Sequence, residues 1–493
     1  MGTLPRTIQE AVQVCRNLKI RYLWVDALCI IQGNKEDFAT EISRMGSIYA
    51  SSVLTIAATA ASDANAGFMK RRYPLYTDHC YVQDSNESTL FFANEPAHNH
   101  DDLEGCEMNS RGWVYQERTL SPRTIHFCKT TVIWECRQQQ ACQRCVVDCR
   151  TVRPVHGLGQ KAMFDRIATE ATRATTIPSD FQLTWDLIIA TFSEKSFSYD
   201  SDRLSALAGL AHLMNRDHGY KSSYGLWLPF FRDQILWGCI QSSASLRPER
   251  KIMAGVPSWS WISTRGRVDM NAYRLDFTDY VVGTSMYHLE PAKYMAEITK
   301  LPPATGFSQL SVHDTSSGTP VTFRICGWMV HCKAVPYDSE WSLQSADEKL
   351  TPEGIELEEV SWRNWLNGHP DACSNMEDSY RWRFHPDDEL VWSQRLAYMP
   401  VRHVSSLLRL AGKQQVNVQE HGLILAPVSP TGSVYKRVGV SSRFLKWERL
   451  DPAVRQAHNE AYESNNLPKI QKILTEHDTI VDKRNAKVEI EVG

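Results

Sequence analysis

Two short apolar runs on either side of an amphipathic stretch constrain the fold of this chain most strongly. Residues 22–31 are rich in aromatic and β-branched side chains, which predicts a buried strand of a parallel sheet. Phe38, Ile42, Met45 and Tyr49 are at helical spacing, and residues 53–58 form a second short apolar run. A strand, a helix and a strand within about 40 residues form a βαβ unit, so we expect a small parallel sheet with flanking helices.

The rest of the chain divides by its local patterns into three parts. We expect an α/β domain over residues 1–150, a mainly helical region over 151–265 and a β-containing mixed α+β region over 266–493. A capping box, Thr7-Ile8-Gln9-Glu10, marks the start of the first helix. We expect further helices near residues 111–116, 181–197, 202–214, 226–237, 394–412 and 451–475, and strands over 124–136, 321–329, 421–428 and 435–440.

Composition restricts the class of partner. Hydrophobic residues make up 42% of the 493 residues and charged residues 23%, as in an ordinary globular protein. The net charge of -3 gives no basic field for nucleic acid. No apolar stretch approaches the roughly 20 residues of a membrane-spanning helix, and the first residues do not resemble a secretory signal. We therefore expect a cytoplasmic protein whose partners are other proteins, further copies of itself or a small molecule, with neither membrane nor nucleic acid.

Ordered motifs in the first 140 residues resemble those of fungal heterokaryon incompatibility (HET) domains. The central motif is Leu4-Pro5-Arg6-Thr7-Ile8-Gln9-Glu10-Ala11, followed by Arg21-Tyr22-Leu23-Trp24-Val25-Asp26-Ala27-Leu28-Cys29-Ile30-Ile31-Gln32. The closing motif is Arg111-Gly112-Trp113-Val114-Tyr115-Gln116-Glu117-Arg118-Thr119-Leu120-Ser121-Pro122-Arg123, completed by Trp134-Glu135-Cys136. Members of the family usually carry a further strand motif upstream of the Leu-Pro segment, and we expect this domain to lack that strand.

The resemblance implies a fold and several functions. HET domains are regarded as distantly similar to Toll/interleukin-1 receptor (TIR) domains, which implies a TIR-like α/β fold. Some TIR relatives cleave NAD with a glutamate on a helix, so the resemblance implies NAD as a candidate substrate, while no cofactor is expected with certainty. The leading function that it implies is signalling in fungal non-self recognition and programmed cell death. The alternatives are an NAD-cleaving glycohydrolase and an enzyme recruited to fungal secondary-metabolite biosynthesis.

Three carboxylates near the expected βαβ unit are candidate catalytic residues. Asp26 lies inside an apolar run, where a carboxylate needs hydrogen bonds or a cation. Asp37 and Glu41 are four residues apart and share one side of the expected helix, with Glu41 on the flank of its apolar stripe. A half-buried carboxylate there would have a raised pKa suited to acid/base chemistry. The alternative is a structural role, in which the pair caps the helix and Glu41 forms an ion pair with Arg44 or Arg111.

A dense group of polar and aromatic residues in the closing motif is a candidate ligand-binding site. An arginine beside a tryptophan can hold a phosphate or an aromatic ring. The alternative is that Arg111 and Arg118 neutralise Asp26 or Glu41 inside the fold. The candidate binding residues are Arg111, Trp113, Gln116 and Arg118, with Glu117 in the same group.

Four cysteines are spaced closely enough to raise the question of a metal. Cys142 and Cys145 have the two-residue spacing of structural zinc sites, and Cys136 and Cys149 lie on either side. The second pair of such a site is missing, so we expect no metal and leave zinc as the alternative. In a reducing compartment a disulfide is the weaker interpretation.

Overall fold

The computed structural model divides the chain into two compact units, one formed by residues 1–220 with 307–312 and the other by 221–306 with 313–493. The three-part division expected from the sequence stays a prediction. No helix among the described residues is long and apolar enough to cross a membrane. The structure describes residues 3–70, 80–83, 89–92, 103, 105–143, 161, 178–239, 256–270, 286–288, 293–307, 321–337, 340–345, 383–386, 396–410, 413–428, 434–445, 452–464, 466, 468–470, 472–473 and 487–492.

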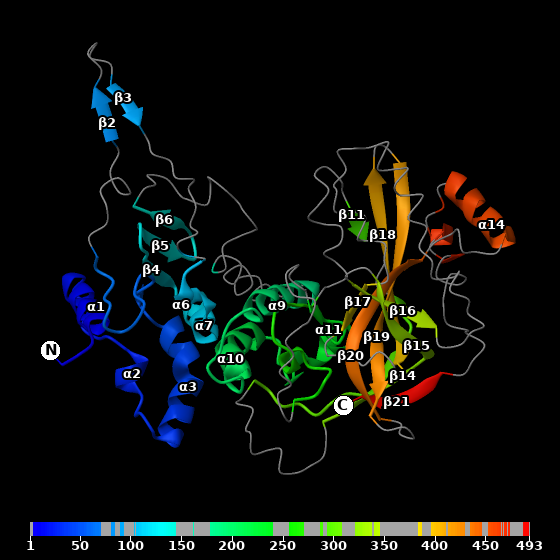
Figure 1. Cartoon of the computed structure of the whole chain (residues 1–493), viewed down its shortest axis with the longest axis horizontal. Coiled ribbons are helices and arrows are strands. Elements are labelled where there is room, and N and C mark those ends of the chain that lie inside the picture. The colour runs from blue at the N-terminus through cyan, green and yellow to red at the C-terminus, as the bar shows by residue number, and fades with distance from the viewer. Residues whose placement is uncertain are drawn as a thin grey trace. The chain divides into compact units, whose positions relative to one another are not determined.

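The first unit combines helices with a small mixed sheet (Figure 1). Its sheet has the order β1-β4-β5-β6, in which β1 pairs with β4 in parallel and the other two pairings are antiparallel. The elements are α1 (Arg6–Asn17), α2 (Asp26–Cys29), α3 (Lys35–Ala50), β1 (Thr55–Ala57), β2 (Cys80–Gln83), β3 (Thr89–Phe92), α6 (Glu107–Ser110), α7 (Gly112–Leu120), β4 (Arg123–Phe127), β5 (Val132–Cys136), β6 (Gln140–Cys142), α9 (Pro178–Phe192) and α10 (Asp202–Asn215).

The prediction of a buried strand over residues 22–31 is wrong. The chain there is extended and then turns through the four-residue helix α2, and Tyr22 is 81% exposed. Asp26 explains the turn, because its carboxylate accepts a hydrogen bond from the N–H of Ala27 at the start of α2. Without this strand there is no βαβ unit between residues 22 and 58. The parallel sheet and the TIR-like fold expected for this region are therefore not confirmed; the mixed α/β class is.

The capping box is also wrong in detail, although the helix it predicted is present. Pro5 is the N-cap of α1 and Thr7 lies within the helix. The Glu10 carboxylate instead accepts hydrogen bonds from the backbone N–H groups of Phe68 and Met69, at 2.5 and 2.7 Å. Glu10 therefore attaches α1 to the segment that follows β1.

Three helices, α3, α7 and α10, pack closely in the first unit. A side chain at Gly46 of α3 would meet the Cα of Gly209 of α10 at 2.8 Å, and Leu120 of α7 lies beside both glycines. The amide of Gln116 on α7 accepts a hydrogen bond from the N–H of Gly209 at 2.8 Å. The two glycines let α3 and α10 approach each other closely, and α7 packs against both helices.

The second unit is built on a large sheet of 11 strands. Its longest strands, β18 and β19, pair antiparallel from Ala397–Leu425 to Leu410–Lys413, so the helix expected over 394–412 is wrong. The elements are β7 (Ser222–Ser223), β8 (Leu226–Trp227), the 3-10 helix η2 (Leu228–Phe230), α11 (Phe231–Gln234), β9 (Gly238–Cys239), the 3-10 helix η3 (Trp261–Ser263), β10 (Val268–Asp269), β11 (Met286–His288), β12 (Lys293–Tyr294), β13 (Glu297–Lys300), β14 (Phe323–Gly327), β15 (Val330–Tyr337), β16 (Glu340–Ser345), β17 (Arg383–Pro386), β18 (Leu396–Leu410), β19 (Lys413–Pro427), β20 (Val434–Leu445), α14 (Pro452–Glu463) and β21 (Val488–Val492).

Tryptophans fill part of the core of the second unit. Trp237, Trp259 and Trp261 are fully buried, and the indole N–H of Trp237 donates to the carbonyl of Trp259 at 2.8 Å. The guanidinium of Arg437, on β20, lies over the Trp237 ring at 3.7 Å from its centroid. The aromatic residues at 257–261 are therefore packing residues.

The Gly46–Gly209 contact gives a test of this packing. Alanine favours a helix over glycine, so Gly46→Ala would stabilise an isolated α3. In the folded protein its methyl group meets backbone that cannot move away cheaply, and we expect a loss of about 1–3 kcal/mol in unfolding free energy. Urea denaturation measures this loss in unfolding free energy. Ser47→Ala on the exposed side of α3 is the control and should change stability by less than about 0.5 kcal/mol; equal effects of the two substitutions would contradict the close contact.

Candidate functional site

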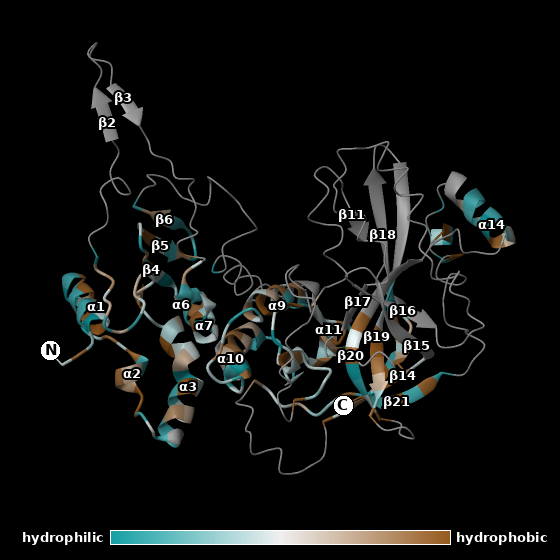
Figure 2. Ribbon diagram, viewed as in Figure 1, coloured by the Kyte–Doolittle hydropathy of each residue, from teal (hydrophilic) through white to brown (hydrophobic). Residues whose placement is uncertain are grey.

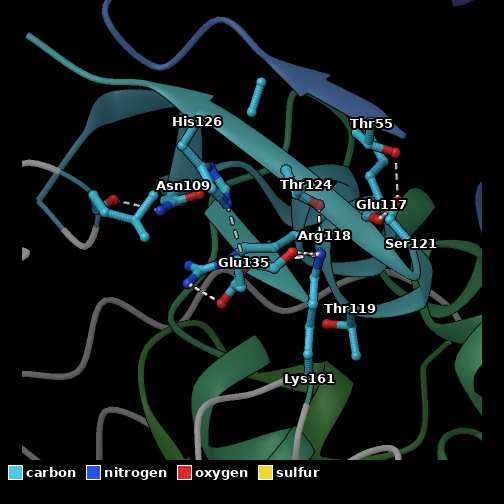
Figure 3. Close-up of polar contacts among 12 residues, drawn as sticks. Thr55, Asn109, Glu117, Arg118, Thr119, Ser121, Thr124, His126, Glu135 and Lys161 are labelled. Atoms are coloured by element: carbon cyan, nitrogen blue, oxygen red, sulfur yellow. Dashed lines mark hydrogen bonds and ion pairs between the residues drawn. The ribbon is translucent and has the colours of Figure 1, made fainter. Parts of the chain in front are cut away.

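Helix α7 carries a closed polar network on the side that faces the sheet (Figure 3). The guanidinium of Arg118 donates two hydrogen bonds of 2.9 Å to the carboxylate of Glu135 on β5. His126 on β4 lies 3.2 Å from the same carboxylate, and the ammonium of Lys161 donates to the hydroxyl of Thr124. These side chains are all at most 10% exposed. The network is therefore sealed from solvent.

Two basic side chains of this network, Arg118 and Lys161, share the single carboxylate of Glu135. Burial alone would raise the pKa of Glu135, but the Arg118 charge and the His126 contact hold it well below its ordinary value. Burial lowers the pKa of His126, which keeps its imidazole neutral. Burial also lowers the pKa of Lys161 to about 8, against the attraction of Glu135. A bidentate arginine–carboxylate pair at this depth fixes the position of α7, and removing one partner of such a pair typically costs about 3–5 kcal/mol.

The neighbouring residue on α7, Glu117, belongs to a second and more open group. Its carboxylate accepts a hydrogen bond from the hydroxyl of Tyr49, which lies near the end of α3. The ring of Trp24 meets that of Tyr49 edge to face at 5.7 Å. Asp26, at the start of α2, and Arg111, the N-cap of α7, are exposed and act on the pair through their charges. We call these five residues the Glu117 cluster.

The electrostatics of the Glu117 cluster suit proton transfer. Burial raises the pKa of Glu117 to about 7, and the negative charge of Asp26 raises it further, while the Tyr49 hydrogen bond and Arg111 oppose the shift. Burial and the Glu117 charge raise the pKa of Tyr49, so its hydroxyl stays protonated. A carboxyl group that is half ionised near neutral pH can both take up and release a proton. Perturbed groups of this kind gather at functional sites, although structural pairs show them too.

Two of the seven site residues predicted from the sequence are in this cluster, and the other five, Asp37 and Glu41 among them, are elsewhere. Asp26 and Arg111 both act on Glu117. Glu41 forms an ion pair with Arg44 at 3.2 Å, the structural role considered for it above. The Asp37 carboxylate accepts a hydrogen bond from the N–H of Ile31 at 2.8 Å and so fixes the turn before α3.

The other predicted binding residues make polar contacts within the fold. The indole N–H of Trp113 donates to Asp202 at 3.3 Å, and Gln116 is bound to Gly209 of α10. The expectation that Arg118 neutralises Asp26 or Glu41 is wrong, because its partner is Glu135 on the neighbouring sheet. Helix α7 turns Arg118 toward β5 and Glu117 toward α3, so adjacent residues serve different groups.

Sequence reasoning missed Tyr49 and Trp24 as site residues and treated Glu117 only as a member of a motif. Tyr49 lies on the apolar side of α3, where spacing predicts a core residue. The useful signal was Glu117 itself, since a carboxylate between the buried Gln116 and Arg118 must itself find partners.

The zinc alternative gains no support from the described residues. No group of three or more histidine, cysteine, aspartate or glutamate residues among them could hold a metal ion. Cys136 ends β5 and Cys142 ends β6. Cys145 and Cys149 lie outside the described residues.

Comparison with protein families identifies the N-terminal part of the chain. Residues 2–117 match the family model described as heterokaryon incompatibility protein (HET). This match confirms the resemblance seen in the motifs as far as residue 117. No curated protein and no solved structure matches the chain. All five residues of the Glu117 cluster lie inside the matched segment, whereas Glu135 and Lys161 of the closed network lie beyond it.

The raised pKa of Glu117 predicts a pH dependence of stability. The folded protein holds this proton more tightly than the unfolded chain, because the pKa rises from 4.5 to about 7 on folding. The contribution to stability is present below the unfolded value and is lost as the pH rises through about 7. Glu117→Gln, which cannot ionise, should therefore gain stability relative to the wild type between pH 5 and pH 8, measured by urea denaturation.

A second substitution controls for the loss of one charge. Glu36→Gln removes an exposed carboxylate from the first turn of α3. Its unfolding free energy should follow that of the wild type over the same range. If Glu117→Gln also follows the wild type, the pKa assigned to Glu117 is wrong.

Proposed function

We propose that this protein is a cytoplasmic HET-domain protein that acts in fungal non-self recognition. Its role there is to signal programmed cell death. The family match over residues 2–117 supports this role. The signal passes through a ligand site formed by the Glu117 cluster. Other proteins or further copies of the chain are its partners, and a small molecule is the ligand of the site.

One observation supports the ligand site above all: groups from three segments of the chain gather around the partly buried Glu117. Trp24 and Asp26 lie in one segment at the start of α2, Tyr49 lies near the end of α3, and Arg111 is the N-cap of α7. A ligand with an aromatic ring and a negative charge would find a ring surface and a guanidinium here. Its charge would also alter the ionisation of Glu117, which makes the site sensitive to occupancy.

Expression in a filamentous fungus tests the signalling role. Induced expression of the wild-type chain should cause growth arrest and cell death, scored by uptake of a vital dye. Glu117→Gln keeps the shape of the side chain but removes its ionisation, so we expect death to be lost. Glu41→Gln is the matched control on the exposed ion pair and should behave as the wild type, with protein levels checked by immunoblot. Death that persists in Glu117→Gln contradicts a role for the site, and absence of death with the wild type contradicts the signalling role.

A second candidate function, cleavage of NAD, is favoured by the pKa of Glu117. Water would attack the anomeric carbon of the nicotinamide ribose, nicotinamide would leave with the electron pair of the glycosidic bond, and the proton of water would pass to Glu117. Glu117, whose pKa is raised to about 7, is suited to this step, whereas Glu41 is held in an ion pair with Arg44. The third hypothesis, a role in secondary-metabolite biosynthesis, has no comparable support among the described residues.

Nicotinamide release from NAD by the purified chain tests the second candidate. If Glu117 is the base, Glu117→Gln should reduce the rate by about 100-fold or more, the usual contribution of general acid–base catalysis. Glu41→Gln should keep the wild-type rate. No release by the wild type, or release that Glu117→Gln leaves unchanged, overturns the enzymatic proposal; cell death without NAD cleavage would leave the signalling proposal in place.

A further inference from the structure

The segment of residues 21–25 belongs to no helix and to no sheet, and its last residue is extended. Val25 has φ -139° and ψ 123°, which are strand values. Within the described part of the chain, the N–H groups of residues 21–25 donate to no carbonyl oxygen, and among their carbonyl oxygens only that of Val25 accepts, from Leu28 and Cys29. Five consecutive residues therefore present an almost unpaired backbone.

Apolar side chains are exposed in this segment and on either side of it, while Leu23, Trp24 and Val25 are half-buried. Tyr22 is 81% exposed, Leu28 54% and Ile31 62%, and Leu18 before the segment is 52% exposed. Figure 2 shows hydrophobic colouring along the ribbon around α2. Exposed apolar patches mark interaction surfaces in soluble proteins, and these four side chains lie in one short stretch of the chain.

The composition of the segment suits a strand better than a loop. Tyr22, Trp24 and Val25 are of the aromatic and β-branched types that favour pleated structure, and the segment contains neither proline nor glycine. An extended, unpaired backbone with such side chains is a template for pairing with another strand. Its sequence predicts a strand, and none of the described strands pairs with it.

The charges at the two ends of the segment indicate which partner fits. Arg21 and Asp26 lie at opposite ends, and both are exposed. If two copies pair antiparallel, Arg21 of each copy faces Asp26 of the other, Tyr22 faces Val25, and Leu23 faces Trp24. A parallel pair would place like charges side by side, which is unfavourable. The segment is therefore complementary to itself in one orientation.

We propose that residues 21–25 form an antiparallel strand pair with the same segment of a second copy of this chain, which makes a two-fold symmetric dimer with Asp26, the first residue of α2, at each end of the pair. Such an interface is isologous, so each Arg21–Asp26 contact occurs twice. The dimer buries the apolar side chains around α2 and satisfies the free backbone groups. The inference depends on the backbone, exposure and charge of this segment, and it holds whether or not Glu117 has the function proposed above.

Charge reversal of the full-length chain tests the dimer. Analytical ultracentrifugation over a concentration series should show the wild type as a dimer. Arg21→Asp alone should raise the dimer dissociation constant about tenfold or more, because two attractive pairs become repulsive. Asp26→Arg alone should act in the same way. The double variant Arg21→Asp/Asp26→Arg should restore the dimer, since the two charges exchange places.

Arg44→Asp is the matched control, because it makes the same change of charge on an exposed arginine of α3. It should leave the dissociation constant unchanged, and circular dichroism of every variant checks the fold. A wild-type chain that is monomeric at every concentration, a dimer that Arg21→Asp does not weaken, or a double variant that stays monomeric each overturns the proposal. So does binding of a different protein through this segment by a chain that is monomeric alone.

Discussion

The buried pair between Arg118 and Glu135 is the interaction on which the candidate site depends. Two hydrogen bonds of 2.9 Å join α7 to β5 and leave little freedom to rotate the helix. Because consecutive residues of a helix point about 100° apart, fixing Arg118 toward the sheet also fixes Glu117 toward α3. The closed network and the open cluster are thus two consequences of one helix orientation. Gln116 adds a third constraint by binding the backbone of α10.

Burial has opposite consequences for the two carboxylates. Glu135 is surrounded by Arg118, His126 and Lys161, so its negative charge is stabilised although solvent is excluded. Glu117 has Tyr49 as a neutral donor and Arg111 at the exposed edge, and Asp26 opposes its ionisation. The arrangement around Glu135 favours a permanent ion pair. The arrangement around Glu117 favours a carboxyl group that gains and loses a proton near neutral pH. The sign of each pKa shift therefore separates a structural carboxylate from a candidate functional one where the sequence motif treats them alike.

The features predictable from the sequence were those set by local spacing. Helix α3, helix α7 and strands β4 and β5 follow from apolar periodicity and lie close to where the pattern puts them. The predictions of a strand over residues 22–31 and of a helix where β18 lies were wrong. Whether an apolar run becomes a paired strand depends on neighbours that are distant in sequence. Strand β18 has its partner in β19, whereas residues 21–25 have none among the described residues. For the same reason the helix pattern favoured Glu41 over Glu117: the ion pair of Glu41 is local, and the partners of Glu117 come from other elements.

Asp26 connects the proposed strand pair to the candidate site. In the single chain its carboxylate lies exposed, and its charge raises the pKa of Glu117. In the antiparallel dimer the guanidinium of Arg21 from the second copy would stand opposite Asp26 and offset that charge. The repulsion on Glu117 would then weaken, and its pKa would fall toward the ordinary value of a glutamate. Assembly and proton occupancy are therefore linked in a definite direction: the dimer favours ionised Glu117, and protonation of Glu117 favours the separate chains.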